Sequence, residues 1–490
     1  MARSVDHSRH PNASAPPQLM AGLCIGGRPY LPLVALLLLL NGLVLINALL
    51  HDPRVGYDAG NHLRYLAALA SGRLVTPEDS GEFFSPPLPY VFPALVMGAT
   101  HLDLYWAAKL GQLLNVLLSI ATSLYVLRIC HLINPEGRSL KLGALGFLAI
   151  LPVYYKTFSY VRGEPYVTVF ATAAAYYAIR ALLQRTSGLR DVVPLGIALG
   201  CAALSRQWGI LLVPGLVVVW ALAAIKETSR RHELTKALAI TLSVSFVISA
   251  WFYLSLDHRY DSMTAFNRKG KPSFALSNQG RSFYVGLGLP QLFTDPIRSA
   301  FPNQLLPIFY SEMWGDYWGY FVVFGRDNRS NEWLVGPQID DALAEPSSSH
   351  WLITNRRDIA AYLGRVNAVS TLPTLLAVAA VLSAGVAVGR FLRTHRPDRE
   401  SSAQCLLFVL LCTSYAGYLW FLIMYPSPGK GDTIKATYML HTFPFVAVLV
   451  GCLFDRLGRI APRLQIAAAA VLVVTFLHNL PAMLTRFTTG

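Results

Sequence analysis

The stretch YLPLVALLLLLNGLVLINALL, residues 30–50, decides the fold class, because it is apolar almost throughout and carries no charged side chain. A helix needs about 20 such residues to cross the hydrocarbon core of a bilayer. The whole chain agrees with this: its 490 residues are 54% hydrophobic and 14% charged, whereas about 25% of a soluble protein is charged. The sequence therefore predicts an all-α polytopic membrane protein.

Further apolar runs bring the predicted number of spans to about eleven. The predicted spans lie near residues 30–50, 105–128, 142–158, 165–183, 191–206, 208–225, 237–256, 371–392, 404–424, 435–454 and 464–483. The apolar stretch 87–100 is too short to be a span and contains Pro89 and Pro93. We interpret it as a juxtamembrane helix that lies in the membrane interface.

Lysine and arginine gather in short loops between the apolar runs. These residues are Arg128, Arg138, Lys141, Arg185, Arg190, Lys226, Arg230, Arg231, Lys236, Arg390, Arg393, Arg396, Arg399, Arg456, Arg459 and Arg463. All of these loops fall on one side of the membrane when 87–100 is not counted as a span, which by the positive-inside rule is the cytoplasm. The net charge of +14 therefore indicates membrane orientation and not a nucleic-acid partner, and the N-terminus is predicted to be cytoplasmic.

This orientation divides the chain into four parts. Residues 1–29 form a disordered cytoplasmic tail, residues 30–256 a transmembrane module with an outer loop at 51–104, residues 257–370 an extracytoplasmic loop domain, and residues 371–490 the last transmembrane helices. The turn 154–164 and the loop 425–435 also face outward. None of the six cysteines lies in an outer loop, which excludes a disulfide framework or a thiolate zinc site there.

Three residues of the outer turns are candidates for acid–base chemistry. Asp58, in GYDAGNHLRY at 56–65, is either a general base or the N-cap of a helix that begins at Ala59 or Gly60. Glu164 is a second acid, a metal ligand or half of an ion pair with Arg162. His62, one helical turn after Asp58, binds substrate or is an interfacial histidine. If a divalent metal takes part, Asp58, Glu164 and His62 are its candidate ligands.

The outer face also offers cations for a phosphate group, namely Arg206, Arg162, Lys156, Lys435 and Lys430. Arg206 is the strongest candidate because it interrupts two apolar half-runs, where a charge is costly without a partner. The alternative is that Arg206 snorkels to the lipid headgroups. Lys435 is the first residue of a predicted span and follows a glycine-containing turn. It either anchors this span at the membrane surface or binds phosphate.

An aromatic cluster at 310–320 lies in the long outer segment. Trp314 is a candidate for stacking against a sugar, with Glu312 and Asp316 as hydrogen-bond partners of its hydroxyls. Alternatively, these aromatic residues belong to the interfacial belt that membrane proteins carry anyway. Tyr57 and Tyr155 are further candidate substrate contacts.

Several motifs together resemble a known class of enzymes. The acidic loop with Asp58 is followed by a Gly-Arg-Leu turn at 72–74 and by Phe-Phe-Ser-Pro-Pro-Leu at 83–88, and later by YYKTFSYVRGEP at 154–165 and ALSRQWG at 203–209. This order resembles the membrane-embedded glycosyltransferases of the GT-C class, and in particular the branch with the protein O-mannosyltransferases and the lipid A aminoarabinose transferases. Many of these relatives carry paired acids where this chain has Asp58-Ala59, and a histidine at the position of Ser85.

The resemblance implies a transferase that moves a sugar from a polyprenyl phosphate, of dolichyl or undecaprenyl type, to a protein, lipid or glycan acceptor. It implies an active site on the periplasmic face of a bacterial inner membrane or the lumenal face of the endoplasmic reticulum. A transporter or lipid flippase is the main alternative, and it predicts charged residues in mid-span and repeated halves. A non-catalytic scaffold is a third possibility. The sequence leaves the sugar, the acceptor and any metal open.

Overall fold

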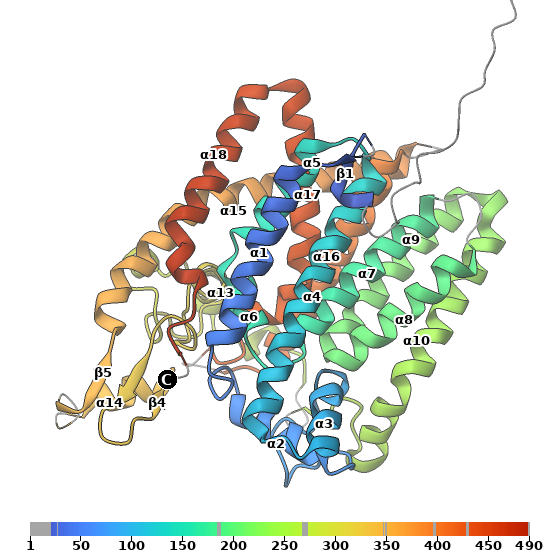
Figure 1. Ribbon diagram of the computed structural model, residues 1–490. Coiled ribbons are helices and arrows are strands. Elements are labelled where there is room, and N and C mark those ends of the chain that lie inside the picture. The colour runs from blue at the N-terminus through green and yellow to red at the C-terminus, as the bar shows by residue number, and fades with distance from the viewer. Residues whose placement is uncertain are drawn as a thin grey trace, which may run out of the picture.

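The computed structural model describes residues 21–26, 28–183, 188–266, 273–345, 347, 350–394, 398–427 and 431–488. Within these residues, nine helices are long and apolar enough to cross a membrane (Figure 1), which confirms the predicted all-α polytopic class. They are α1 (Leu31–Leu50), α4 (Leu104–Ile133), α7 (Glu164–Leu183), α9 (Leu212–Lys226) with η2 (Gln207–Leu211), α10 (Arg231–Tyr260) with η3 (Thr228–Arg230), α15 (Arg356–Arg393), α16 (Arg399–Met424), α17 (Phe443–Ile460) with η6 (Ala436–Thr442), and α18 (Pro462–Asn479) with η7 (Leu480–Met483).

The other two predicted spans are shorter or interrupted helices. One is α8 (Leu189–Ser205), with 17 residues. The predicted span 142–158 is divided into α5 (Arg138–Ala149) and α6 (Pro152–Phe158). The division falls before Pro152, which has no backbone N–H to continue the hydrogen bonds of α5. As a result, α6 is a separate short helix directly before the turn that leads to α7.

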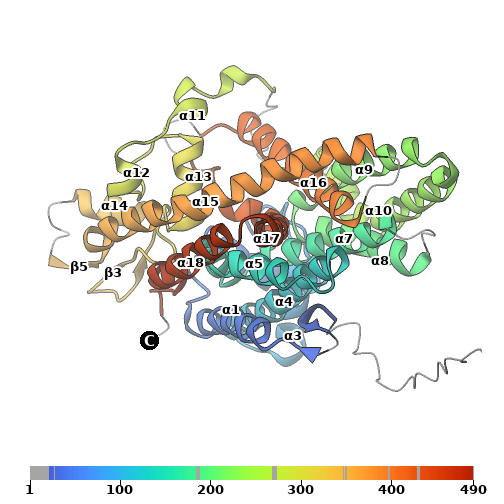
Figure 2. The same ribbon diagram turned by 90° about the horizontal axis from the view of Figure 1, so that it is seen from above.

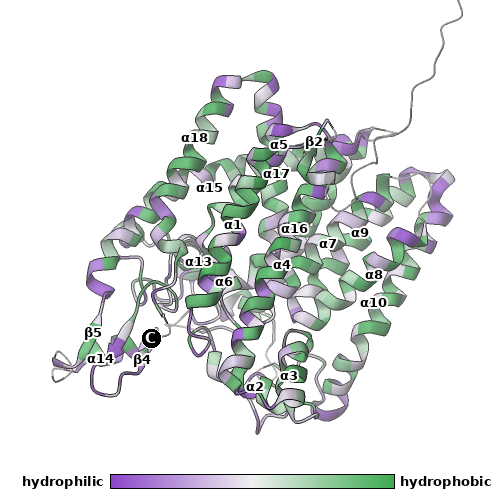
Figure 3. Cartoon of the chain, viewed as in Figure 1, coloured by the Kyte–Doolittle hydropathy of each residue, from purple (hydrophilic) through white to green (hydrophobic). Residues whose placement is uncertain are grey.

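Helix α17 lies in the centre of the bundle, as the view from above shows (Figure 2). In its most apolar stretch, including η6, 89% of the residues are buried, compared with 22% in α15 and 28% in α18. The hydrophobic colouring accordingly covers most of the length of the outer helices, and the hydrophilic residues gather at the two ends (Figure 3). This is the distribution expected of a bundle whose outer helices face lipid.

Glycines allow the closest helix contacts. A Cβ atom at Gly451 of α17 would lie 2.3 Å from the carbonyl oxygen of Leu140 in α5. On α8, Gly196 and Gly200 face α10, where added Cβ atoms would lie 2.7 Å from side-chain atoms of Val244 and Ile248. Small residues four apart are typical of close helix packing in membranes. This contact fixes α8, and with it the chain directly after α8.

The two ends of the bundle differ in character (Figure 1). The upper end carries η1 (Ala21–Leu23) with the strand pair β1 (Cys24–Ile25) and β2 (Arg28–Pro29), and the basic turns between α9 and α10 and between α17 and α18. The lower end carries α2 (Ala59–Ala70) and α3 (Leu88–Thr100), which is the short apolar helix at 87–100. The basic loops thus lie opposite the outer loop that holds Asp58.

The segment between α10 and α15 is an ordered set of short elements. These are η4 (Leu276–Asn278), α11 (Arg281–Val285), α12 (Gln291–Thr294), α13 (Leu305–Trp314), α14 (Pro337–Ala344), and the antiparallel sheet of β4 (Trp333–Leu334), β3 (Gly325–Asp327) and β5 (Leu352–Thr354), in that order across the sheet. Helix α15 begins at Arg356, earlier than the predicted span at 371, because its first turns are polar and lie outside the apolar run.

The chain after η7 returns to the loop that follows α1. Asn47 of α1 donates from Nδ2 to the carbonyl of Met483 at 2.7 Å and accepts from the backbone N–H of Thr485 at 2.9 Å. A backbone bridge joins His51 to Thr488. These bonds tie the start of the outer loop to the last described residues of the chain.

Candidate active site

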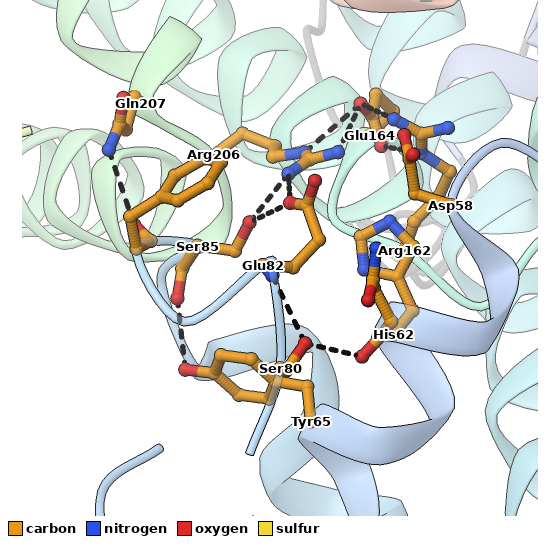
Figure 4. Close-up of polar contacts among 12 residues, drawn as sticks. Asp58, His62, Tyr65, Ser80, Glu82, Ser85, Arg162, Glu164, Arg206 and Gln207 are labelled. Atoms are coloured by element: carbon orange, nitrogen blue, oxygen red, sulfur yellow. Dashed lines mark hydrogen bonds and ion pairs between the residues drawn. The ribbon is translucent and has the colours of Figure 1, made fainter. Parts of the chain in front are cut away.

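Segments that are far apart in the sequence meet at the lower end of the bundle. Asp58 precedes α2, Arg162 and Glu164 lie in the turn between α6 and α7, and Arg206 joins α8 to η2. Figure 4 shows the side chains of these residues pointing toward one another around the loop that precedes α3. Lys435, directly before η6, reaches Asp58 from the other side. The structure therefore brings together five residues that the sequence predicts for the site.

Glu164 is the centre of a buried ion-pair cluster. Arg162 donates from Nε to Oε2 at 2.6 Å and from Nη2 to Oε1 at 2.8 Å, and Arg206 donates from Nε to Oε1 at 3.0 Å. The carboxylate of Glu164 has no exposed surface. A guanidinium matches a carboxylate in this two-pronged geometry. Of the three interpretations of Glu164, the geometry corresponds to the ion pair, which holds both arginines in place.

Arg206 has a second set of partners on its other side. Its Nη1 donates to the hydroxyl of Ser85 at 2.8 Å and to Oε2 of Glu82 at 3.3 Å, and Ser85 donates to the same Glu82 oxygen at 2.6 Å. Only 8% of the Arg206 side chain is exposed. Arg206 is thus held inside the protein by acidic partners, and the interpretation that it snorkels to the headgroups does not fit.

Asp58 begins α2 as predicted, but its side chain does not cap the helix. The residue has φ +55°, and its carboxylate accepts no hydrogen bond from the first turn. Instead, Oδ2 lies 3.5 Å from Nζ of Lys435, and 42% of the side chain is exposed. Partial burial raises the pKa of the Asp58 carboxyl, but the positive charge of Lys435, with smaller contributions from other groups, outweighs it, so the pKa lies below its ordinary value. Asp58 is therefore an ionised and accessible carboxylate at neutral pH.

Two tyrosine rings hold the cations in place. The Nζ of Lys435 lies 5.0 Å from the centre of the Tyr57 ring and 5.6 Å from that of Tyr438. The guanidinium carbon of Arg162 lies 5.4 Å and 5.8 Å from the same two ring centres. These are cation–π distances. Tyr57, predicted as a substrate contact, is buried. In this structure its ring packs against Lys435 and Arg162.

His62 is fully buried behind Asp58. Its Nδ1 is hydrogen-bonded to the hydroxyl of Tyr90 at 2.7 Å, and burial lowers the pKa of His62 well below its ordinary value. Its imidazole is therefore neutral at physiological pH. In the described part of the chain, no group of three or more His, Cys, Asp or Glu residues could hold a metal ion. Both oxygens of Glu164 accept hydrogen bonds from arginines, so in this structure Glu164 is not arranged with Asp58 and His62 around a common metal position.

Lys156, Glu312 and Asp316 form a second buried cluster, which Tyr57 connects to the first because its hydroxyl donates to the carboxylate of Glu312. Lys156 donates to the carboxylate of Glu312 and to the carbonyl of Gly315, the latter at 3.1 Å. Asp316 accepts backbone N–H groups of the following turn at 2.6–3.1 Å. The sequence predicted that Lys156 binds phosphate and that the two acids bind sugar. The packing of α13 on α6 turns these charges toward one another instead, because a buried charge needs a partner.

Two predicted aromatic contacts are also internal. Trp314 donates from Nε1 to the hydroxyl of Thr374 at 2.9 Å, and Tyr155 donates to the carbonyl of Ala149 at 2.6 Å. Both side chains are fully buried, so neither presents a ring face to a sugar. Lys430 lies outside the described residues.

A mostly apolar cleft of about 230 Å³ leads away from the cluster around Arg206. Its polar end is formed by Arg206, Ser85 and Glu82. The other lining residues are mainly apolar and come from the loop before α3, from η2, from the segment after α10, from the end of α16 and from η6; they are Phe84, Pro86, Gln207, Trp208, Ile210, Leu211, Thr264, Phe266, Gly417, Trp420, Phe421, Tyr425 and Tyr438. Trp420 is 50% exposed on a membrane-spanning helix. The cleft thus opens toward the lipid-facing side of the bundle and ends at a guanidinium.

Sequence reasoning missed Glu82 and Tyr438 and noted Ser85 only as a departure from a motif. Glu82 is the nearest acid before the Pro86-Pro87 turn, which was a usable signal. Tyr438 had no such signal, because its role follows from the way η6 packs against α7. It lines the cleft and also contacts Arg162 and Lys435, so it connects the cleft with the surroundings of Asp58.

Comparisons with known proteins give matches only among solved structures. No protein-family model and no curated protein sequence match this chain. ArnT from Cupriavidus metallidurans bound to undecaprenyl phosphate is 15% identical, with a TM-score of 0.39 over 88% of this chain and 77% of that one. The oligosaccharyltransferase AglB from Archaeoglobus fulgidus, in complex with an inhibitory peptide and a dolichol-phosphate, is 12% identical, with a TM-score of 0.48 over 92% of this chain and 56% of that one.

A second structure of the Archaeoglobus fulgidus oligosaccharyltransferase, tethered to an acceptor peptide, has the same TM-score of 0.48 and identity of 12%, over 94% of this chain and 56% of that one. This chain therefore spans little more than half the length of the oligosaccharyltransferase. The matched structures are GT-C glycosyltransferases, the class that the motifs of the outer loops resemble. At such identities and TM-scores, the function has to be inferred from the residues of this chain.

Proposed function

We propose that this protein is a membrane glycosyltransferase that moves a sugar from a polyprenyl phosphate to an acceptor hydroxyl or amine. The observation that carries the proposal is the mostly apolar cleft that Arg206 lines, together with the accessible carboxylate of Asp58, which lies outside the cleft lining and is connected to it through Lys435 and Tyr438. A lipid-linked sugar phosphate has matching parts: an apolar chain, an anionic head and a polar sugar. We infer that the polyprenyl chain of the donor lies between η2 and α16. Arg206 and Ser85 bind its phosphate.

The sugar would then extend past Tyr438 toward Lys435 and Asp58. Tyr438 lines the cleft and also contacts Lys435, which in turn pairs with Asp58. The C1 atom of the sugar, bonded to the phosphate, would lie between the cations and the carboxylate. In this arrangement the leaving group and the base would lie on opposite sides of the reacting carbon.

The reaction is a direct displacement at C1. Asp58 takes the proton of the acceptor, whose oxygen or nitrogen forms a bond to C1 as the bond from C1 to the phosphate oxygen breaks. The electron pair of that bond leaves with the lipid phosphate, whose negative charge Arg206 stabilises. Asp58 suits the role of base because it is ionised and accessible, whereas Glu164 is enclosed by two arginines and acts by positioning them.

The distribution of basic residues supports a site on the outer side of the membrane. The arginine- and lysine-rich turns lie at the upper end of the bundle, opposite α2 and α3 (Figure 1). By the positive-inside rule this end is cytoplasmic, so the site faces the periplasm of a bacterial inner membrane or the lumen of the endoplasmic reticulum.

The proposal is tested by the binding and turnover of lipid phosphates. The purified protein is titrated with undecaprenyl phosphate, and a panel of polyprenyl-phosphate and polyprenyl-diphosphate sugars is assayed for release of the lipid phosphate. We expect saturable binding that Arg206→Ala weakens at least about tenfold, since a charge-assisted hydrogen bond contributes about 1.5–3 kcal/mol. Binding that is absent, or unchanged in a folded Arg206→Ala variant, would contradict the proposal.

A further inference from the structure

Glu82 occupies the polar end of the cleft in an unusual way (Figure 4). Its Oε2 accepts one hydrogen bond from the Ser85 hydroxyl at 2.6 Å and one from Nη1 of Arg206 at 3.3 Å. Both donors line the cleft. An O–H and a guanidinium N–H that converge on one anionic oxygen are the donors that a phosphate oxygen uses. The carboxylate of Glu82 therefore lies where the proposed function needs the phosphate of the donor.

Arg206 does not depend on Glu82 for its position. Its Nε and Nη2 both lie 3.0 Å from Oε1 of Glu164, which is itself held by Arg162. The position of Ser85 does not depend on Glu82 either. The backbone carbonyl of Ser85 accepts a hydrogen bond from the hydroxyl of Tyr65 at 2.9 Å. The two donors would stay in place if the Glu82 carboxylate moved away.

Glu82 itself is held less firmly. It lies in the irregular turn at 81–85, directly after a glycine and outside any helix or strand. Its side chain is 14% exposed, whereas that of Glu164 has no exposed surface. Of the two carboxylates that bind Arg206, Glu82 is therefore the one that can leave.

We propose that Glu82 is an internal anion that takes the place of the donor phosphate in the ligand-free protein and is displaced when the donor binds. This inference rests on the proposed function. A free anion must displace Glu82 with its charge alone, whereas a lipid phosphate adds the burial of its chain in the apolar cleft. Glu82 thus weakens the binding of soluble and lipid-linked phosphates by the same factor, and only the lipid-linked ones recover affinity through their apolar chain.

Competition from Glu82 should weaken the apparent affinity for phosphate by a measurable factor. If the carboxylate fills the position for about nine-tenths of the time, only the remaining tenth of the molecules can bind, and the apparent affinity is about tenfold weaker than without it. Removing the charge of Glu82 should therefore strengthen phosphate binding. A purely structural ion pair predicts the opposite, because its loss would loosen the site.

The test measures the binding of two probes, farnesyl phosphate and inorganic phosphate, to the purified full chain in detergent. We expect Glu82→Gln to bind farnesyl phosphate about tenfold more tightly than the unaltered protein, and to bind inorganic phosphate at concentrations where the unaltered protein does not. Asp103→Asn is the matched control. It removes one acidic charge at the same end of the bundle, and asparagine replaces aspartate well at the N-cap of α4, so it should leave both affinities unchanged.

Glu82→Asp is a second test variant, which keeps the negative charge but shortens the side chain. Its carboxylate is one methylene shorter and cannot reach Arg206 in the same way, so it should also bind farnesyl phosphate more tightly than the unaltered protein. Equal or weaker binding of farnesyl phosphate by both Glu82 variants, with normal binding by the unaltered protein, overturns the role of Glu82 and leaves the proposed function standing. Failure of every variant and of the unaltered protein to bind farnesyl phosphate would instead overturn the proposed function.

Discussion

At the scale of single residues, the site separates two acids by their surroundings. Asp58 is exposed, paired with one lysine at 3.5 Å, and has a pKa below its ordinary value. Glu164 is enclosed, with two arginines on its two oxygens. In the proposed mechanism, the chemistry of the site therefore depends on Asp58, and the geometry of its cations depends on Glu164.

Asp58→Asn tests the role of Asp58 as a base. Asparagine adopts the left-handed backbone conformation that residue 58 requires, so we expect the variant to fold normally. It cannot accept a proton, so the rate of sugar transfer should fall by about 10²- to 10⁴-fold, while binding of undecaprenyl phosphate is retained. Turnover close to that of the unaltered protein would place the base elsewhere.

Lys435→Gln tests the cause of the low pKa. The charge of Lys435 lowers the pKa of Asp58, so Asp58 stays ionised as the pH falls below the ordinary aspartate range near about 4. Transfer activity should therefore be lost only as the pH falls through that low value. Without Lys435 the pKa rises, and the acidic limb of the pH–rate profile should move to higher pH. If the acidic limb of the Lys435→Gln profile lies at the same pH as that of the unaltered protein, the prediction is wrong, even if the maximal rate differs.

At the scale of elements, the position of Arg206 depends on how α8 packs. Arg206 directly follows α8, and α8 lies against α10 through Gly196 and Gly200. A methyl group at residue 200 would lie 2.7 Å from the Cβ of Ile248 and 3.0 Å from the carbonyl of Ser245. Backbone atoms cannot move aside locally, so α8 as a whole would have to shift.

We therefore expect Gly200→Ala to destabilise the protein by about 1–3 kcal/mol, the usual range for overpacking, and to weaken undecaprenyl phosphate binding. The control is Gly42→Ala on α1, where an added Cβ meets nothing within 4 Å. Thermal unfolding in detergent and lipid-phosphate titration measure the two effects. Equal stability of both variants would show that α8 and α10 are less closely packed than the distances indicate.

At the scale of the whole molecule, the basic turns and the candidate site lie at opposite ends of the bundle, so we expect them on opposite sides of the membrane. Arg54, near Asp58, and Arg459, at the end of α17, have side chains that are 67% and 61% exposed. In intact cells or sealed vesicles, a membrane-impermeant thiol reagent should label Arg54→Cys and Arg459→Cys from opposite sides. Labelling of both from the same side would refute the assignment of the site to the outer face.

Much of this arrangement could be predicted from the sequence because it is set locally. The lengths of the apolar runs predict the membrane spans. The position of Asp58 directly before a stretch with helical character predicts the start of α2. Lys156 could not be assigned in the same way, because its partner Glu312 lies 156 residues later in the chain. The direction of such a side chain follows from tertiary packing, and a charge near an outer turn is as easily paired internally as offered to a ligand.

The bond between Asn47 and Met483 also sets an order of events during synthesis. The two residues are separated by 436 positions, so the loop before Asp58 is delivered to the membrane surface long before the segment that fastens it. Contacts of such long range form late. While the chain is being made, the loop that holds Asp58 therefore stays untethered until the segment around Met483 has been synthesised and has reached it.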